Sequence, residues 1–451
     1  MKQSGFITAL LQRKKVMDRK DNQIEIIPIK KRIVGEAAMP GSKSFTNRAL
    51  VMAALSRGKS RILGYSDSDD SEILIKVLKK VGVKIIKTNK QIIIQGNGGV
   101  FKEFNGTINL GMAGTAMRFF TAVACLIPGK IILDGNERMR QRPIAELING
   151  LRKLGAEIRY LQKQGCPPIE ISKPIKKGGV VSMNGGVSSQ YFTALLLIAP
   201  VLTNGLEIKV IGKQISKSYI DMSISGLKDF GVKVKNENYR KYIVSDRERY
   251  KATRYIVEGD ASGASYFWAI AAVSQGKIKV KNINPVSLQG DVKFADLLKR
   301  MGCEVVKNKK EKWIEVEGVG ELMGIEANME QMPDTAQTLA MVAAFAKGET
   351  KITGLHTLKD KETDRLLALQ AELAKMNIKT KIGPDYIVIE GGKPKGAFIK
   401  TYNDHRMAMA FAVAGVKIPG VVIENPGVVA KSFPEFWNKF NSLGIETKIN
   451  N

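Results

Sequence analysis

The sequence predicts an α/β protein of two lobes, each built from three similar units. Two observations support this prediction. At 451 residues the chain is too long for one compact core, so at least two domains are expected. A hydrophobic helix end followed by glycine, or once by asparagine, also recurs at intervals of about 67 to 76 residues, at Gly82, Gly155, Gly231, Gly302, Asn377 and Gly444.

Each of the six units is expected to open with a turn of small or polar residues that leads into an apolar helix. These turns lie at residues 41–44, 113–116, 187–190, 259–262, 333–336 and 402–405. A strand, a second helix ending at the glycine and further strands should follow, and the isoleucine run 92–94 is typical of the later strands. The units therefore alternate helices and strands.

The two ends of the chain are expected to share one lobe. The sixth unit, which begins near Asn403, stops at the C-terminus before its last strands, and segment 24–38 has a strand pattern but no unit of its own. We expect this segment to supply one of the missing strands. The prediction is therefore a split lobe, residues 22–41 plus 260–451, and a continuous lobe, residues 42–259.

Two crossovers, near Pro40 and Gly259, would connect these lobes and form a hinge for closure around a ligand. Residues 1–21 are basic and weakly amphipathic, and they lack the long apolar stretch of a signal peptide. We expect them to be a disordered leader.

The composition narrows the classes of function. The chain has 71 Lys and Arg against 43 Asp and Glu, a formal net charge of +28. Lysines are spread along the chain, and the aromatic residues, 7% of the total, do not alternate with them as in a platform for single-stranded nucleic acid. We therefore favour a solvated basic surface first, small polyanionic ligands second and nucleic acid last.

No apolar run approaches the roughly 20 residues that a membrane span needs. Cys125, Cys166 and Cys303 form no CxxC pair, which argues against a disulfide framework or a zinc site. This pattern is typical of a reducing compartment, so a cytoplasmic protein is expected.

The turns that open the helices are candidate anion sites, because helix N-termini present free N–H groups and a partial positive charge. The turn at 40–44 is similar to a phosphate-binding P-loop, but the Gly-x-x-x-x-Gly-Lys spacing is not met, and no Gly-x-Gly-x-x-Gly follows a strand. A nucleotide-binding enzyme is therefore not expected.

Arginine usage points to a particular kind of ligand. After Arg300 only Arg365 and Arg406 remain, although lysines are abundant there. Arginine offers a forked geometry that matches carboxylate and phosphate, so these two residues are candidates for binding such groups. The alternative is that both are incidental surface residues.

Eight motifs, in order from about residue 30 to the C-terminus, resemble the signatures of the 5-enolpyruvylshikimate-3-phosphate synthase family. They lie at residues 40–48, 113–118, 141–144, 188–190, 333–334, 361–365, 404–409 and 430–434. One such motif is weak, but eight in family order are highly specific. The resemblance implies a two-lobed enolpyruvyl transferase fold of six βαβαββ-type units, three per lobe, which agrees with the repeat count.

The resemblance also implies two anionic substrates in the cleft between the lobes, phosphoenolpyruvate and shikimate 3-phosphate, and no metal or other cofactor. It assigns to shikimate 3-phosphate Lys43, Ser44, Arg48, Ser188, Ser189, Gln190, Ser216, Tyr219, Asp334, Thr357 and Lys361. It assigns to phosphoenolpyruvate Lys43, Gly114, Arg142, Gln190, Arg365, Arg406 and Lys431. Charge-assisted bonds of about 1.5–3 kcal/mol each would orient both anions.

The implied reaction joins the 5-hydroxyl of shikimate 3-phosphate to C2 of phosphoenolpyruvate while C3 is protonated, and then eliminates phosphate. It needs a base and an acid. Asp334 is the expected base and Glu362 the expected proton carrier at C3, assisted by Lys43 or Lys431. From the residues alone, Asp334 could instead cap a helix, and Glu362 could pair with a neighbouring cation on a surface helix.

Two residues differ from the family pattern, and the roles of two others are open. Met112 stands where the family usually has asparagine, and Thr357 where it often has an asparagine that contacts shikimate 3-phosphate; neither change removes a charge. His405 is expected to order its neighbours rather than to transfer a proton. Gly114 either leaves room for phosphoenolpyruvate or supplies a positive φ to its turn.

The alternative function is that of the sister enolpyruvyl transferase, which acts on UDP-N-acetylglucosamine. That enzyme uses a loop cysteine and has no Lys-Ser-x-x-Asn-Arg turn, whereas Cys125 lies in an apolar stretch and Cys166 precedes two prolines. A basic nucleic-acid module of repeated α/β units would not require Asp334, Glu362 or the sparse arginines. We expect a monomeric enzyme of two small-molecule substrates, without nucleic-acid or membrane partners.

Overall fold

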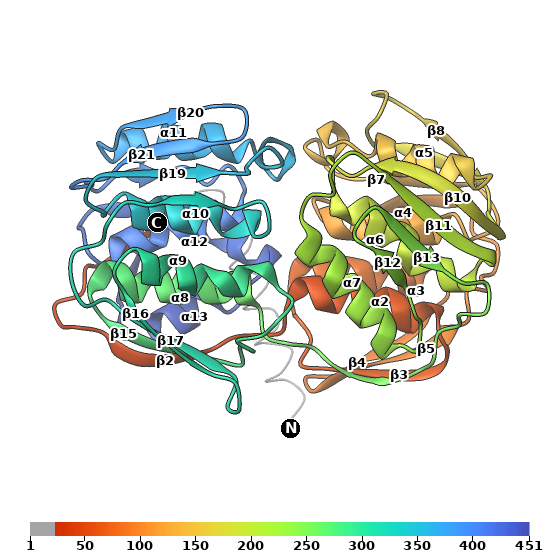
Figure 1. Ribbon diagram of the computed structural model, residues 1–451, viewed down its shortest axis with the longest axis horizontal. Helices are drawn as coiled ribbons and strands as arrows, with labels where there is room; N and C mark the ends of the chain where they lie inside the picture. Colours follow the sequence, from red (N-terminus) through yellow and green to blue (C-terminus); the bar gives the residue numbers. More distant parts are fainter. Residues whose placement is uncertain (1–22, 451) are drawn as a thin grey trace, which may run out of the picture.

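The computed structural model describes residues 23–450 and has two lobes that lie side by side (Figure 1). In that view the first lobe, coloured red-orange to green, is on the right. The second lobe, coloured green to blue together with the red strand β2 (Val34–Ala38), is on the left. The predicted leader, residues 1–21, lies outside the described residues. None of the helices in residues 23–450 has the length and hydrophobicity that crossing a membrane requires.

Each unit contains two α-helices with different surroundings. The first helix is buried along most of its length: α2 (Lys43–Leu55), α4 (Gly114–Ala124) and α6 (Ser189–Ile198) in the first lobe, α8 (Ala261–Ser274), α10 (Ala336–Ala343) and α12 (His405–Gly415) in the second. The second helix buries one face: α3 (Asp69–Lys80), α5 (Ala145–Lys153), α7 (Lys217–Asp229), α9 (Phe294–Arg300), α11 (Arg365–Lys375) and α13 (Phe436–Asn441).

The recurring glycine has a conformational cause. In every unit the second helix ends two or three residues before the Gly or Asn of the repeat, and that residue has a positive φ, from 62° at Asn377 to 107° at Gly302. A left-handed residue just after the last turn is a common way to end a helix, and glycine and asparagine adopt it most readily. The sequence period therefore marks helix termination.

The strands form six four-stranded sheets. Those of the first lobe are β3 (Arg57–Leu63), β4 (Lys84–Lys87), β5 (Gln91–Asn97), β6 (Gly106–Asn109), β7 (Ile131–Asp134), β8 (Glu157–Tyr160), β9 (Ile169–Lys173), β10 (Lys177–Asn184), β11 (Thr203–Ile211), β12 (Lys235–Glu237), β13 (Lys241–Val244) and β14 (Arg254–Ile256). Those of the second lobe are β1 (Gln23–Ile26), β2 (Val34–Ala38), β15 (Lys277–Lys281), β16 (Glu304–Asn308), β17 (Trp313–Glu317), β18 (Glu326–Asn328), β19 (Glu349–Thr353), β20 (Thr380–Ile382), β21 (Ile387–Glu390), β22 (Phe398–Ile399), β23 (Val421–Glu424) and β24 (Thr447–Asn450).

All six sheets share one topology. Their orders are β14-β3-β5-β4, β6-β7-β9-β8 and β10-β11-β13-β12 in the first lobe, and β2-β15-β17-β16, β18-β19-β21-β20 and β22-β23-β1-β24 in the second. In each order the first two strands are parallel and the remaining neighbours antiparallel. This repetition agrees with the prediction of six α/β units, three per lobe.

The prediction for segment 24–38 was incomplete. The segment forms two strands in two different sheets: β1 lies between β23 and β24, whereas β2 pairs with β15. The expectation that the sixth unit lacks all its last strands was wrong, because β24 ends it at Thr447–Asn450. Residues 23–26 therefore supply one of the two inner strands of that sheet.

Two separate hydrophobic clusters fill the lobes. One runs from Phe45 to Val257, and the other combines residues 24–39 with residues 261–445. At the junction the amide of Ser42 donates to the carbonyl of Glu258 (2.8 Å), and that of Asp260 to the carbonyl of Pro40 (2.9 Å). We propose that these paired crossovers divide the chain at the predicted boundaries, into 42–259 and 22–41 plus 260–451.

Candidate active site

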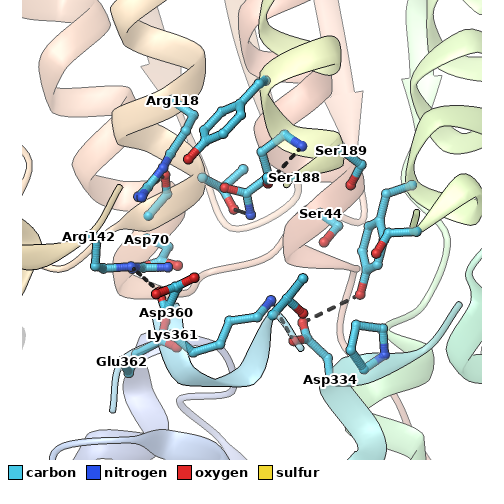
Figure 2. A pocket seen from close by; sticks show the side chains of 18 of the residues that line it. Ser44, Asp70, Arg118, Arg142, Ser188, Ser189, Asp334, Asp360, Lys361 and Glu362 are labelled. Carbon is cyan, nitrogen blue, oxygen red and sulfur yellow. Dashed lines mark hydrogen bonds and ion pairs between the residues drawn. The ribbon is translucent and has the colours of Figure 1, made fainter. Parts of the chain in front are cut away.

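A cavity opens between the lobes, and its lining comes from both of them. Figure 2 shows first-lobe side chains such as Arg118 and Ser188 facing second-lobe side chains such as Asp334 and Lys361. Seven lining residues are Lys or Arg and four are Asp or Glu. The lining includes these predicted site residues: Lys43, Ser44, Arg48, Gly114, Arg142, Ser188, Ser189, Gln190, Ser216, Tyr219, Asp334, Thr357, Lys361, Glu362, Arg365 and Arg406.

Helix N-termini from the two lobes reach this cavity in different states. In the first lobe α2, α4 and α7 begin after Ser42, Ala113 and Ser216, and none of these residues caps its helix through the side chain. In the second lobe Asp364 and Asp404 cap α11 and α12. In the first lobe, therefore, α6 is capped by Ser188, whereas α2, α4 and α7 keep free N–H groups and helix dipoles that no capping side chain compensates, which favours anions at those three ends.

Two buried arginines lie beside the uncapped end of α4. Arg142 donates from Nε to the carbonyl of Asp360 (3.1 Å), but its buried Nη1 has no hydrogen-bond partner among residues 23–450. Arg118 donates from Nη2 to the carbonyl of Pro143 (2.9 Å). Burial, followed by the charge of Arg142, lowers the pKa of Arg118 to about 10. An anion placed here would compensate both guanidinium groups.

Gly114 allows this arrangement. A Cβ atom on Gly114 would lie 2.5 Å from Nη1 and 2.7 Å from Nη2 of Arg142, which is closer than real contacts. Gly114 is not among the described residues with positive φ, so the interpretation that it supplies a left-handed turn is wrong. The residue gives space to Arg142.

Asp334 lies where four side chains of the site converge. It lies in the 3₁₀ helix η4 (Pro333–Thr335) and accepts from Arg406 Nη2 at 2.7 Å, Arg365 Nη1 at 3.3 Å, Lys361 Nζ at 3.4 Å and the Tyr219 hydroxyl at 3.5 Å. Burial raises its pKa, but Arg406, Lys361 and Arg365 outweigh burial and hold the pKa well below its usual range. Asp334 caps no helix, so that alternative is excluded.

Arg365 and Arg406 are 1% and 5% exposed, which excludes the interpretation that they are incidental surface residues. Arg365 binds both carboxylate oxygens of Asp404, with 2.7 Å from Nε and 3.2 Å from Nη2, and also contacts Glu362. Arg406 pairs with Asp334, while its buried Nε has no partner among the described residues. Each arginine is thus held in place by carboxylates.

Glu362 is buried rather than placed on a surface helix. Its carboxylate lies 2.9 Å from Arg365 Nη2 and 3.6 Å from Lys431 Nζ. Burial raises the pKa of Glu362, but Arg365, Lys431 and Arg142 bring it well below its usual range. The side chain is therefore a carboxylate at neutral pH.

His405 lies beside this network at 1% exposure. Burial, followed by the charges of Arg406 and Lys43, lowers its pKa well below the usual value, so the ring is neutral. Neither ring nitrogen has a hydrogen-bond partner among residues 23–450, and Nδ1 lies 3.5 Å from Asp404 Oδ1.

Lys431 is the one predicted site residue that does not line the cavity. Its ammonium donates to Asp70 Oδ1 (2.7 Å) and to the carbonyl of Met112 (2.8 Å), while Asp70 Oδ2 accepts from Lys43 (3.0 Å). Asp70 thus bridges lysines of both lobes. The contact at Met112 uses the main chain, so the unusual side chain there leaves it intact.

The residues assigned to shikimate 3-phosphate lie mostly on the first-lobe side, with Asp334, Thr357 and Lys361 contributed by the second lobe. Arg48 uses all three guanidinium nitrogens within the protein, donating to Ser223 Oγ (2.8 Å) and to the carbonyls of Ser44 (2.8 Å) and Tyr219 (3.0 Å). Ser188 Oγ accepts from the amide of Gln190 (3.3 Å). Thr357 also lines the cavity. The ligand contacts of these residues stay predictions.

Sequence reasoning missed several lining residues. Arg118 lies in the motif at residues 113–118, but the motif assigns it neither a substrate nor a catalytic role. Asp70 belongs to an acidic first helical turn, and its partner Lys431 is 361 positions away in the chain. No local pattern connects such a pair. Within residues 23–450 no group of three or more His, Cys, Asp or Glu side chains is arranged to hold a metal ion.

Asp291, in η3 (Gly290–Lys293), offers a test of stability. Burial, followed by the charge of Asp334, raises its pKa from 3.8 to about 7. Its contribution to stability is therefore complete below pH 3.8 and lost as the pH rises through about 7. Asp291→Asn should raise the Tm at pH 8, by the equivalent of about 1–3 kcal/mol, and change it little near pH 4. Thermal melts at both values test this.

The exposed Asp296 on α9 provides the control. Asp296→Asn should leave the Tm nearly unchanged at both pH values, because that carboxylate is half-exposed and, among residues 23–450, forms an ion pair with Lys307 alone. A Tm for Asp291→Asn equal to that of the wild type at pH 8 would contradict the prediction.

Comparisons with known proteins agree on one family. A family model described as EPSP synthase (3-phosphoshikimate 1-carboxyvinyltransferase) matches residues 27–440. The chain is 43% identical over 434 residues to the 3-phosphoshikimate 1-carboxyvinyltransferase of Haemophilus influenzae strain PittGG, covering 94% of this chain and 99% of the relative. It is 42% identical over 426 residues to the enzyme of that name from Marinomonas sp. strain MWYL1, with coverage of 94% and 99%.

A solved structure of EPSP synthase from Acinetobacter baumannii is also similar, with a TM-score of 0.79, 25% identity, and coverage of 95% of this chain and 100% of that chain. The chain is therefore an enolpyruvyl transferase by fold. It belongs to the EPSP synthase family.

Proposed function

We propose that the protein transfers the enolpyruvyl group of phosphoenolpyruvate to the 5-hydroxyl of shikimate 3-phosphate and releases phosphate, a reaction of aromatic amino acid biosynthesis. The observation that carries the proposal is the set of cations around the cavity. Seven Lys and Arg side chains line the cavity between the lobes, and the uncapped N-termini of α2, α4 and α7 also lie there. Two substrates that each carry a phosphate and a carboxylate match this charge.

The two substrates occupy different parts of the cavity in this proposal. Phosphoenolpyruvate lies against Arg142 and Gly114, where Arg142 Nη1 has no partner among the described residues, and near Arg365 and Arg406. Shikimate 3-phosphate lies against the serines at 188 and 189 and faces Asp334. Its 5-hydroxyl then approaches the Asp334 carboxylate, which Arg406, Arg365 and Lys361 contact.

Asp334 accepts the proton of the 5-hydroxyl as the oxygen bonds to C2 of phosphoenolpyruvate. Glu362 delivers a proton to C3. In the ligand-free site Glu362 is ionised, but bound phosphoenolpyruvate shares the charge of Arg365 and Lys431, and this raises the pKa of Glu362. In the second step the Glu362 carboxylate takes a proton back from C3, the bond from C2 to the phosphate oxygen breaks, and phosphate leaves with that electron pair.

The alternative acceptor, UDP-N-acetylglucosamine, is not favoured. The cysteine that such an enzyme uses has no counterpart in the cavity, since Cys125, Cys166 and Cys303 are all buried and none lines it. Burial also raises the pKa of each thiol, which disfavours the thiolate. We propose that the enzyme works as a monomer in the cytoplasm.

Release of phosphate from phosphoenolpyruvate, measured with and without shikimate 3-phosphate, tests the function. We expect release only when both substrates are present, and a product that carries the enolpyruvyl ether. Release with UDP-N-acetylglucosamine in place of shikimate 3-phosphate would contradict the assignment of the acceptor.

Ligand-induced closure is a further prediction, because the cavity takes side chains from both lobes. Shikimate 3-phosphate should decrease the radius of gyration measured by small-angle scattering, since Ser188 and Arg48 belong to one lobe and Asp334 and Lys361 to the other. An unchanged radius at saturating ligand would count against a hinge.

A further inference from the structure

Arg138 crosses from the first lobe to the second without entering the cavity. It immediately precedes η1 (Met139–Gln141), and its guanidinium donates from Nε to the carbonyl of Lys361 (3.1 Å) and from Nη2 to the carbonyl of Lys359 (2.9 Å). Arg142, one turn later, donates to the carbonyl of Asp360 between them (3.1 Å). Three consecutive second-lobe carbonyls therefore accept hydrogen bonds from two first-lobe arginines.

The segment that accepts these bonds is held unevenly within its own lobe. Leu355 and Leu358 are buried, and their amides donate to the carbonyls of Asp385 and Leu355 at 2.8 Å each, but the main chain just after them is held less closely. The segment includes η5 (Leu358–Asp360), where the amides of Asp360 and Lys361 reach the carbonyls of Thr357 and Leu358 at 3.4 Å each. Ordinary N–H···O bonds are near 2.9–3.0 Å, so these bonds are long. Gly354, with φ of 75°, precedes the segment.

This segment also contains two residues of the candidate active site, Lys361 and Glu362. Lys361 contacts Asp334, and Glu362 follows at once with its bonds to Arg365 and Lys431. A displacement of the main chain at 359–361 would therefore move two side chains of the proposed acid–base and substrate-binding set. At residues 359–361 the hydrogen bonds from the opposite lobe, at 2.9–3.1 Å, are shorter than the 3.4 Å bonds that the amides of Asp360 and Lys361 make within the segment.

We propose that Arg138 is a positioning residue, which holds segment 355–364 in its working conformation when the lobes are together. The proposal rests on the proposed function. Arg138 does not line the cavity and so acts through Lys361 and Glu362. Its forked guanidinium spans two carbonyls, a geometry that the single ammonium of lysine does not reproduce.

The neighbouring Arg140 is a matched control. It lies two residues away, and it binds Asp134 of its own lobe, from Nε at 2.9 Å and from Nη2 at 2.6 Å. Three variants separate the possible causes of an effect. Arg138→Ala removes the contact across the lobes, and Arg138→Lys removes the forked geometry but keeps the positive charge. Arg140→Ala removes an arginine that bonds only within its own lobe in the described part of the chain.

Amide hydrogen exchange of peptides spanning 355–364 measures how firmly this segment is held. It is recorded on the full-length protein alone and with saturating shikimate 3-phosphate, so that the state in which the lobes are together is included, and the effects below refer to that state. Arg138→Ala should speed exchange there about tenfold or more, while Arg140→Ala should not. In the phosphate-release assay Arg138→Ala should lower kcat about 10- to 100-fold with an unchanged Tm, because two charge-assisted bonds are lost. Arg138→Lys should recover only a small part of either loss.

Unchanged exchange in Arg138→Ala would overturn the proposal, as would full recovery by Arg138→Lys or an equal effect of Arg140→Ala. An unchanged kcat despite faster exchange would also overturn it, because the segment would then move without consequence. If the wild-type protein releases no phosphate, the proposed function fails, while the exchange experiment still decides whether Arg138 holds the segment.

Discussion

Glu362→Gln should lower kcat by about 10²–10⁴-fold while both substrates still bind. The amide keeps the shape of the side chain but cannot carry the proton to C3. Because Glu362 sits among Arg365 and Lys431, removing its negative charge leaves these cations more available to phosphoenolpyruvate, so the KM for that substrate should not rise. Steady-state kinetics with each substrate varied in turn give both parameters.

Glu372 supplies the control for this experiment. It is another buried carboxylate, on α11, the helix that begins three residues after Glu362. There it accepts from Lys375 and from the Tyr402 hydroxyl (2.7 Å), but it does not line the cavity. Glu372→Gln should cost stability and leave kcat nearly unchanged. Near-normal turnover in Glu362→Gln would return Glu362 to the role of an ion-pair partner.

Asp334→Ala should be at least as damaging as the change at Glu362. It removes the proposed base and also leaves Arg406, Lys361 and Arg365 without the carboxylate that joins them. The loss should therefore appear in kcat and in the KM for shikimate 3-phosphate together. A variant that retains wild-type kcat would exclude Asp334 as the base.

The repeat was visible in the sequence because its physical causes are local. A helix that ends in a left-handed residue selects Gly or Asn at that position, and a buried helix selects a run of small and apolar residues. Both preferences act within one turn, so six helix ends and six helix starts could be found without any knowledge of tertiary structure. The helices then fell at the expected places, α12 beginning at His405 and α11 ending just before Asn377.

Pairings between distant segments could not be found in this way. The place of β1 between β23 and β24 depends on partners about 400 residues away, and a strand of four residues carries no signal for its sheet. The same limit applies to Asp70, whose bridge between Lys43 and Lys431 exists only after the lobes have come together. The sequence around Arg138 likewise does not indicate that this side chain donates to main-chain carbonyls of the other lobe, those of Lys359 and Lys361.

The scarcity of arginine after Arg300 was informative for a different reason. Lysine suffices for a solvated surface, whereas a guanidinium can join several carboxylates at once. Arg365 does so with Asp404, Glu362 and Asp334, and Arg406 binds Asp334. What the sequence could not show is that these partners are protein carboxylates, which hold the arginines in place before any ligand arrives.

Gly114→Ala should raise the KM for phosphoenolpyruvate about 10- to 100-fold and change the KM for shikimate 3-phosphate little, because it disturbs one charge-assisted contact of Arg142. The added methyl would lie 2.5 Å from Nη1 of Arg142, so the guanidinium must move away from the end of α4. The backbone at Gly114 tolerates alanine, because its φ is not positive and it begins a helix. The fold should therefore be unaffected.

Gly226, in α7, provides the matched control for Gly114→Ala. It is also a buried helical glycine, but a Cβ there would meet only the end of the Met52 side chain, at 2.9 Å, away from the cavity lining. Gly226→Ala should leave both KM values unchanged. Paired KM measurements with a thermal melt decide the matter: equal losses for both substrates in Gly114→Ala, or a large fall in its Tm, would contradict an effect that acts through Arg142.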